Sequence, residues 1–512
     1  MRWTSLLFGG LNFGVRNLCM FRQRCGLGLT TVMALLLIPS SLQAACPPDA
    51  ISVPVGSDIQ AMAKNASEGK SFCILQGVHR MQRIVPKRGQ KFIGEKGAVL
   101  NGSIILKDFR REGRYWVVST DAPMAKSRGD CLQTRPYCYR SNRIYFSNRL
   151  FEPTLSLEAV VPGSFFFDGT RIYLVDDPSS ALVELTIVAH AFWNHDAADV
   201  EIRNLTIEKY ATRSQDPAIF SGENFKVANW IIEDNEVRYN SAVGIAAGRG
   251  CRVARNNVHH NGQLGISLNG DDTIIENNTI SHNNTHGYNA SWEGGGLKAT
   301  VVSRIAIRNN HVFENNGTGL WCDENCQSIT FEGNTVEKNA DAGIFFEISD
   351  TAVISGNTVR YNGTGAGGQQ GKHWFWGAEI LIAGSKNVVV TGNKVRVSEQ
   401  GSGIMLIDQG REQKGNKSFY ETVRNSVHHN EIIYDGDGES GAASDVETGH
   451  LQERIIETGN NIFDHNTYVF PDDQIDNRFI WGHKEMGFAE FQSLGQEKSG
   501  AIAEHSNDMT NR

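Results

Sequence analysis

The sequence has no CxxC pair and no HExxH motif, the spacings that commonly hold a zinc ion. It also has no long block of basic residues, so nothing in it indicates a nucleic-acid partner. Proline is scarce, at 12 of 512 residues, whereas 53 residues are glycine and 40% are apolar. This composition is typical of a folded chain rather than a disordered one. We therefore expect no metal and no other cofactor, and the net charge of −8 argues mildly against a polyanionic partner.

An apolar run near the N-terminus, TTVMALLLI, is too short to cross a bilayer but suits the core of a signal peptide. Arg22 and Arg24 supply the positive flank, and Ala44 provides a small residue at the cleavage position. We expect residues 1–44 to be a signal peptide and the rest to be exported to the periplasm or outside the cell, with no stable membrane insertion after cleavage. The alternatives are an uncleaved anchor and a lipid attached to Cys46.

The chain has nine cysteines, of which seven remain once such a leader is removed. An exported protein meets an oxidising compartment, so disulfides are allowed. Cys131 and Cys138 share a short loop and are predicted to pair. Cys251 is expected to remain as a buried free thiol. Two further pairings are open, namely Cys46 with Cys73 and Cys322 with Cys326.

A short phrase, Asn followed two positions later by Val or Ile, recurs through the middle of the chain. It begins at Asn235, Asn256, Asn278, Asn310, Asn334, Asn357, Asn393 and Asn430. Steps of 21 to 24 residues suit one rung of a three-strand coil, and larger steps indicate a rung plus an insertion. The intervening runs are short and β-branched, which favours strands over helices. Asparagine side chains stacked in this way can hydrogen-bond along the coil, so the phrase predicts an asparagine ladder.

A second phrase, Gly followed by Ile or Leu, recurs with the same spacing at Gly244, Gly265, Gly296, Gly319 and Gly343. An antiparallel sandwich would not keep two phrases in register over so many repeats. The two phrases predict an all-β chain that forms a right-handed parallel β-helix, a solenoid with one cooperative core. The expected parts are an N-terminal cap with the first rungs at 45–108, a β-rich insertion at 109–190, the β-helix at 191–470, and a C-terminal tail packed outside at 471–512.

Successive side chains in a strand point to opposite faces, so the glycine phrase also predicts the outer face. The first and third positions after each glycine are apolar and should face the core, and the second and fourth should face solvent. The fourth position is Asp323 in one rung and Glu347 in the next. Stacked parallel strands lie about 4.8 Å apart, so the two carboxylates should repel and at least one pKa should rise. A retaining glycosidase needs its two carboxyl groups about 5 to 5.5 Å apart.

Other side chains are expected near this pair. The second position gives Trp321 and Phe345, whose rings could stack on a sugar, and Lys298 one rung earlier, while Asn269 lies in the acid column. Insertions at 281–295 and 363–376 each enter just before a glycine strand and should wall a cleft on either side of the acids. The residues that they would bring to it are His286, Tyr288, Trp292, Glu293, His373, Trp374 and Trp376. Glu379 follows, at an outward position when counted from Gly377.

The stretch from about 290 to 360, which contains GLWCDENC and GIFFEISD, resembles the β-helix glycoside hydrolases that include a β-xylosidase family. Those enzymes carry a Gly-[Ile/Leu]-Trp-x-Asp strand one rung before a strand with Glu. The resemblance implies that Asp323 is the nucleophile and Glu347 the general acid/base. The chain departs from the family at Cys322, which replaces a commoner apolar residue, and after Glu347, where Ile-Ser-Asp replaces an Asn/Ser-His-Gly turn.

Two other functions remain open at this point. A polysaccharide lyase or uronate epimerase could use Lys298 or His286 as the base and Tyr288 as the acid. It would also need a cation to neutralise the uronate, and the sequence shows no aspartate cluster of the calcium-binding kind. A non-catalytic glycan-binding solenoid would keep the aromatic residues but has no need of stacked acids. All three functions imply a carbohydrate partner.

Overall fold

The computed structural model describes residues 46–124, 128–224, 226–363, 375–399, 401–415, 418–471 and 476–503. The chain divides into the units Met1–Gln43 and Ala44–Arg512, and everything below concerns the second unit. The predicted signal peptide lies outside the described residues. Within the described ranges, no helix is both long enough and apolar enough to cross a membrane.

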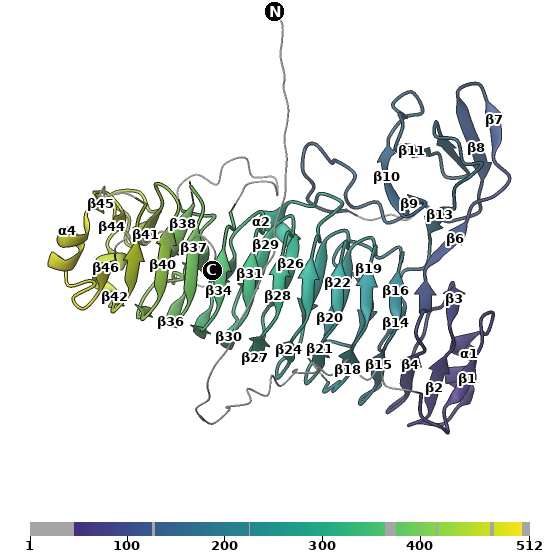
Figure 1. Cartoon of the computed structure of the whole chain (residues 1–512), viewed down its shortest axis with the longest axis horizontal. Coiled ribbons are helices and arrows are strands. Elements are labelled where there is room, and N and C mark those ends of the chain that lie inside the picture. The colour runs from purple at the N-terminus through teal and green to yellow at the C-terminus, as the bar shows by residue number, and fades with distance from the viewer. Residues whose placement is uncertain are drawn as a thin grey trace, which may run out of the picture. The chain divides into compact units, whose positions relative to one another are not determined.

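Three long sheets wind around one core, and Figure 1 shows their strands following one another from the purple to the yellow end of this unit. Sheet 1 comprises β1 Ile51–Val53, β2 Ser71–Ile74, β4 Lys91–Gly94, β15 Glu201–Arg203, β18 Ile231–Glu233, β21 Arg252–Ala254, β24 Ile274–Glu276, β27 Ser303–Arg308, β30 Gln327–Glu332, β33 Asp350–Ser355, β36 Lys386–Thr391, β39 Ser426–His428 and β42 Ile462–Asp464. Sheet 2 comprises β14 Phe192–Trp193, β17 Pro217–Phe220, β20 Val243–Ala247, β23 Leu264–Leu268, β26 Gly295–Thr300, β29 Thr318–Asp323, β32 Ile344–Glu347, β35 Ile380–Ala383, β38 Ser402–Asp408, β41 Glu439–Ser444, β44 Phe479–Gly482 and β45 Lys484–Met486. Sheet 3 comprises β3 Gly77–Arg80, β5 Ala98–Asn101, β16 Thr206–Glu208, β19 Glu236–Arg238, β22 Asn257–His259, β25 Thr279–Ser281, β28 His311–Phe313, β31 Thr335–Glu337, β34 Thr358–Arg360, β37 Lys394–Val397, β40 Glu431–Tyr434, β43 Thr467–Val469 and β46 Ala501–Ala503.

Neighbouring strands in these sheets are parallel, except that β45 runs antiparallel to β44. Each turn of the chain therefore adds one strand to each sheet, which makes the unit a parallel β-helix. Inward side chains of like kind stack in register, as Leu297, Leu320 and Ile344 do in sheet 2. These side chains are buried, and burying each one stabilises the fold by roughly 1.5–3 kcal/mol before the entropy cost of folding. Short helices cap or connect the coil: α1 Ile59–Asn65, α2 Ala290–Glu293, α3 Ile455–Thr458 and α4 Phe488–Ser493.

The structure contains the predicted asparagine ladder. The backbone N–H and the side-chain amide of Asn310 both donate to Asn334 Oδ1, at 2.9 and 3.0 Å, and Asn334 donates to Asn357 in the same way. The same pattern links the other members from Asn235 to Asn430 and continues to Asn466. These bonds satisfy buried backbone donors at every turn, which is why the phrase recurs.

A second ladder, which we did not predict, explains the glycine phrase. Its members are Asn240, Asn261, Asn283, Asn315, Asn339 and Asn362. A Cβ atom on Gly319 would lie 2.7 Å from the carbonyl oxygen of Gly343 and 2.9 Å from the amide nitrogen of Asn339. Glycine is therefore required where the strand passes the second ladder, because no side chain fits there.

The N-terminal insertion forms its own eight-stranded sheet, which runs from residue 103 to residue 186. Its strands are β6 Ser103–Ile105, β7 Arg110–Glu112, β8 Tyr115–Ser119, β9 Ile144–Phe146, β10 Arg149–Thr154, β11 Ser164–Phe167, β12 Arg171–Leu174 and β13 Val183–Thr186. The sheet has a separate apolar core that includes Phe151 and Leu185. The buried side chain of Glu184, on β13, pairs with Lys209 next to β16, which ties the insertion to the coil.

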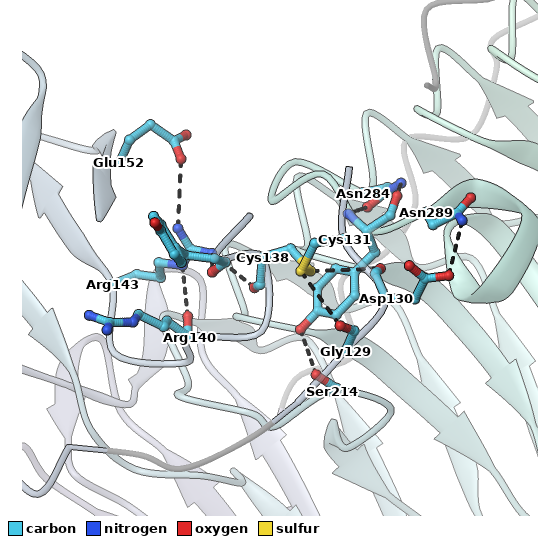
Figure 2. Close-up of a disulfide and its surroundings, with 12 residues drawn as sticks. Gly129, Asp130, Cys131, Cys138, Arg140, Arg143, Glu152, Ser214, Asn284 and Asn289 are labelled. Carbon is cyan, nitrogen blue, oxygen red and sulfur yellow. Dashed lines mark hydrogen bonds and ion pairs between the residues drawn. A yellow bond between two sulfur atoms is a disulfide. The ribbon is translucent and has the colours of Figure 1, made fainter. Parts of the chain in front are cut away.

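Cys131 and Cys138 form the predicted disulfide, in a loop of the insertion that lies against the coil (Figure 2). Around it, Asn289 donates to Asp130 at 3.0 Å, and the buried Arg143 donates to the carbonyl oxygen of Cys138. The two pairings left open by the sequence, Cys46–Cys73 and Cys322–Cys326, are also formed, and Cys251 is a buried free thiol.

The C-terminal tail differs from our expectation. We expected 471–512 to leave the coil, but β44 pairs in parallel with β41, and β46 pairs in parallel with β43. The coil thus continues to Ala503, and α4 packs its Phe491 into the core. The asparagine phrase ends earlier because Glu497 takes the next place in the ladder, where it accepts hydrogen bonds from Asn466.

Candidate active site

Asp323 ends β29, and Glu347 ends β32 on the next rung. The register pairs Trp321 with Phe345 and Cys322 with Phe346, so the two acids fall at the same position on adjacent strands, as predicted. Position four of the preceding rung is Thr300, which pairs with Asp323. The following rungs place Ala383 and Ile407 in this column. The acids therefore lie at the boundary between polar and apolar parts of the outer face of sheet 2.

Lys298 is the central cation of the site. Its ammonium lies 2.9 Å from Asp323 Oδ2 and 3.2 Å from Glu293 Oε1, and it donates to the carbonyl oxygen of Trp292 at 2.8 Å. The same nitrogen sits 3.8 Å from the centroid of the Trp321 ring. A buried ammonium with these partners is compensated and fixed in position. Lys298 and Glu293 were both predicted to lie near the acids, and the structure places the Glu293 carboxylate beside the lysine.

Glu347 is more buried than Asp323. Its side chain is 10% exposed, against 19% for Asp323. Burial, followed by the nearby charge of Asp323, raises the pKa of Glu347 to about 7, although Arg411 and Lys298 act in the opposite direction. Burial also raises the pKa of Glu293. The prediction that one acid of the pair has a raised pKa is thus supported for Glu347.

A segment that we did not predict completes the surroundings of Glu347. Residues 409–415 and 418–421 pair with each other: the Tyr420 N–H donates to the Arg411 carbonyl, and Glu412 forms an antiparallel bridge with Phe419. This pairing places the Arg411 guanidinium 3.2 Å from Glu347 Oε1. No repeat or motif marks this segment, and its only signal in the sequence is the extra length between Asn393 and Asn430.

The aromatic residues beside the acids lie differently from our expectation. Trp321 and Phe345 stack at 5.6 Å, but only 4% and 5% of their surfaces are exposed, so they are not open faces on which a sugar can stack. They begin an apolar cluster on the outer face of sheet 2 that continues through Leu381 and Met405. Trp376, which we predicted near the acids, packs on this cluster at 6.4 Å from Phe345.

Three more of the predicted residues are packing residues. His286 is fully buried, and burial holds its pKa well below the ordinary value. Tyr288 is also buried, and its hydroxyl is bonded to Ser214. Glu379 is not outward: it occupies the glycine position that follows Gly343, and both of its oxygens accept hydrogen bonds from Asn362. It ends the second ladder, and the outward assignment was wrong because we counted from Gly377.

The remaining predicted residues differ in where they lie. Asn269 is exposed on the outer face, two rungs before Asp323. Trp292 is half-buried and lines an open cleft of about 1030 Å³ together with residues 128–130 and 213–216. Gln215 bonds the carboxylate of Glu293, so this cleft adjoins the lysine and the acids. His373 and Trp374 lie outside the described residues.

The site can therefore supply one carboxylate beside a lysine, one desolvated carboxyl group that titrates near neutrality, and an adjoining cleft with polar and aromatic walls. In the described ranges, no group of three or more His, Cys, Asp or Glu side chains is arranged to hold a metal ion.

Comparisons with known proteins agree with this architecture. A family model described as a right-handed β-helix region matches residues 218–373. The structure of XylC in complex with xylose aligns with a TM-score of 0.64 at 15% identity, covering 88% of this chain and 86% of that one. A chain described as a glycoside hydrolase gives 0.50 at 9% identity, covering 79% and 98%. The A-module of the mannuronan C-5 epimerase AlgE6 from Azotobacter vinelandii gives 0.52 at 13% identity, covering 90% and 97%. No curated protein matches the chain.

These findings define the class of the protein. The chain is an all-β, right-handed parallel β-helix, as the two repeated phrases predicted. The identities are low, so the similarity extends to the fold, and the chemistry must be argued from the site itself.

Proposed function

We propose that this protein is an exported glycoside hydrolase that cleaves an oligo- or polysaccharide with retention of configuration. The observation that carries the proposal is the stacking of two acids that differ in burial and in pKa. Asp323 is paired with Lys298, whereas Glu347 is desolvated and has a pKa of about 7. Two carboxyl groups whose environments differ in this way are the usual mark of a nucleophile and an acid/base.

In the first step, an Asp323 oxygen attacks the anomeric carbon while the bond to the leaving oxygen breaks. Glu347 donates its proton to that oxygen, and a glycosyl ester of Asp323 forms. In the second step, Glu347 takes a proton from water, the water oxygen attacks the anomeric carbon, and the ester bond to Asp323 breaks. Lys298 orients Asp323 and returns to its ion pair when the carboxylate is released.

The charges of the site favour a hydrolase over a lyase or epimerase. A uronate carboxylate needs a free cation next to the reacting carbon. Lys298 is shared by Glu293, Asp323 and a carbonyl oxygen, and Arg411 is paired with Glu347. Next to the acids, three carboxyl groups thus surround two cations, which suits a neutral sugar at the point of cleavage. Two further cations, Arg128 and Arg213, line the adjoining cleft together with Asp130 and Asp216. The likeness to the epimerase module concerns the fold and does not change this balance.

The test is a panel of neutral and acidic polysaccharides, assayed both for new reducing ends and for the ultraviolet absorbance of unsaturated uronides, which only lyases produce. Asp323→Asn and Glu347→Gln should each lower turnover by roughly 10³-fold or more. Glu332→Gln, on the exposed side of sheet 1, is the matched control and should keep wild-type turnover. Retention is checked by following the anomer of the first product by NMR.

Three results would count against the proposal. Unsaturated products would indicate a lyase. Binding without any cleavage would indicate a glycan-binding solenoid. Near-normal turnover in either acid variant would show that the pair is not catalytic.

Export is part of the proposal and is tested separately. The leader sequence and the disulfides Cys46–Cys73, Cys131–Cys138 and Cys322–Cys326 support it, because structural disulfides persist in oxidising compartments. N-terminal sequencing of the protein from the cell exterior or periplasm should give a start near Ala45 or Cys46. A retained hydrophobic leader would contradict this.

A further inference from the structure

A disulfide brackets the proposed nucleophile. Cys322 lies in β29, and its side chain faces the core in register with Ala299 and Phe346. It is bonded to Cys326, four residues further on, and both cysteines are fully buried. The disulfide closes a short ring of the chain that contains Asp323. The cross-link therefore limits how far the backbone of Asp323 can move.

The turn inside this ring needs to be held. Glu324 and Asn325 follow Asp323 with φ of 55° and 59°, and Ile348 follows Glu347 with φ of 39°. The left-handed region is uncommon for residues other than glycine, and for a β-branched residue such as Ile it is a true outlier. Such conformations persist only where the surroundings over-determine them. The neighbouring rungs keep one at the same corner, at Val301 with φ of 54° and Gly384 with φ of 53°. Each acid is therefore followed by a backbone position that its neighbours must enforce.

Ser349 connects the two turns. Its hydroxyl donates to the Glu347 carbonyl at 2.6 Å and accepts from the Cys326 N–H at 3.0 Å. The backbone N–H of Ser349 in turn donates to Ser385 Oγ at 3.0 Å. One hydroxyl therefore joins the end of the disulfide ring to the backbone of the second acid.

We propose that the Cys322–Cys326 disulfide and Ser349 form a positioning clamp that sets the spacing between the carboxyl groups of Asp323 and Glu347. The inference rests on the proposed function. The clamp residues act through the backbone and make no contact with the reacting atoms. They matter because they fix the positions of the two acids: a displacement of about 1 Å in a catalytic group can lower the rate about 100-fold.

The Cys46–Cys73 disulfide provides the matched control. It closes a loop with a separation of 27 residues in the first rungs, many rungs away from β29. In the chain-entropy model a longer loop stabilises the fold more. Losing Cys46–Cys73 should therefore lower stability more, and losing Cys322–Cys326 should lower catalysis more.

The experiment compares the double variants Cys322→Ala/Cys326→Ala and Cys46→Ala/Cys73→Ala of the full chain, on a sugar substrate that the wild type cleaves. We expect kcat to fall by about 10- to 100-fold in the first variant, with little change in KM. In the second, kcat should stay at the wild-type value while the urea midpoint falls further. Ala at position 322 fits the core column, since Ala299 occupies it one rung earlier.

A pH profile separates positioning from general loosening. The charge of Asp323 raises the pKa of Glu347, so a wider spacing should lower that pKa and move the basic limb of kcat to lower pH. Ser349→Ala should move the limb in the same direction, whereas Ser349→Thr keeps the hydroxyl and should retain the wild-type limb. The comparison of Ser349→Ala with Ser349→Thr tests the clamp if the cysteine variant does not fold.

The clamp is overturned if Cys322→Ala/Cys326→Ala folds and keeps the wild-type kcat and basic limb, or if Ser349→Ala does so when the cysteine variant does not fold. The proposed function survives that outcome as long as Asp323→Asn is inactive. The proposed function is contradicted, independently of the clamp, if the wild type cleaves no sugar or if Asp323→Asn keeps its turnover.

Discussion

Lys298 Nζ lies 2.9 Å from Asp323 Oδ2 and 3.8 Å from the centroid of the Trp321 ring. The lysine therefore connects the acid pair to the apolar cluster on the outer face of sheet 2. Both acids have a cation beside them, but the partner of Asp323 is the buried Lys298, whereas the more buried Glu347 is paired with the half-exposed Arg411. Removing the charge of Lys298 should affect both acids.

Lys298→Met tests this role. The substitution keeps the stem of the side chain and removes the ammonium, which leaves Asp323 and Glu293 without their shared cation. We expect turnover to fall by roughly 10²-fold or more, because Asp323 loses the group that orients it. Lys386→Met, which breaks the half-exposed pair with Asp350, should leave turnover unchanged. Equal activity in the two variants would contradict the role of Lys298.

The pH dependence follows from Glu347. Its pKa of about 7 means that the proton needed for the leaving group is lost as pH rises through about 7, so activity should fall on the alkaline side. Arg411 lowers this pKa. Arg411→Met should therefore raise it and move the basic limb to higher pH. Lys414→Met, in the same segment but paired with Glu324, is the control and should keep the wild-type limb.

The fold could be predicted from the sequence because its repeats are local. Asn310, Asn334 and Asn357 each accept a hydrogen bond from a backbone N–H of the rung before. Each rung therefore repeats the asparagine phrase in the sequence. The second ladder was also visible, since an Asn follows five residues after each of these three. Once the register was set, Asp323 and Glu347 followed from the alternation of side chains along a strand.

The rest of the site depends on packing that no local pattern encodes. Leu381 and Met405 point outward, yet they are as apolar as core residues, because the outer face is covered at those rungs. Arg411 reaches Glu347 from 64 residues away through a segment with no repeat. Glu379 was misplaced because an insertion precedes it and hides which residue takes the glycine position.

Glu379 gives a prediction about stability. Burial raises its pKa to about 8, above the ordinary value of 4.5 in the unfolded chain. The folded state therefore holds a proton that the unfolded state releases, and stability should fall as pH rises from about 4.5 to about 8. Glu379→Gln removes the ionisable group and one of the two hydrogen bonds from Asn362, so it should abolish most of this pH-dependent loss, which is roughly 5 kcal/mol at most over the whole range. Urea unfolding at several pH values checks it, and an unchanged slope would contradict it.

The asparagine ladder gives the last prediction. Asn334 Oδ1 accepts from the backbone and side-chain amides of Asn310, and its own amide donates to Asn357 and to the carbonyl oxygen of Ile307. Asn334→Ala removes all four bonds and leaves buried donors without partners, so it should lower the free energy of unfolding by roughly 2–5 kcal/mol. Asn257→Ala, at an exposed position on sheet 3, should change it by less than about 0.5 kcal/mol. Urea unfolding of both variants measures the difference. Because Asn334 faces the turn and not the outer face of sheet 2, the folded Asn334→Ala variant should keep its turnover, and a loss of turnover in folded protein would mean that the ladder also positions the acids.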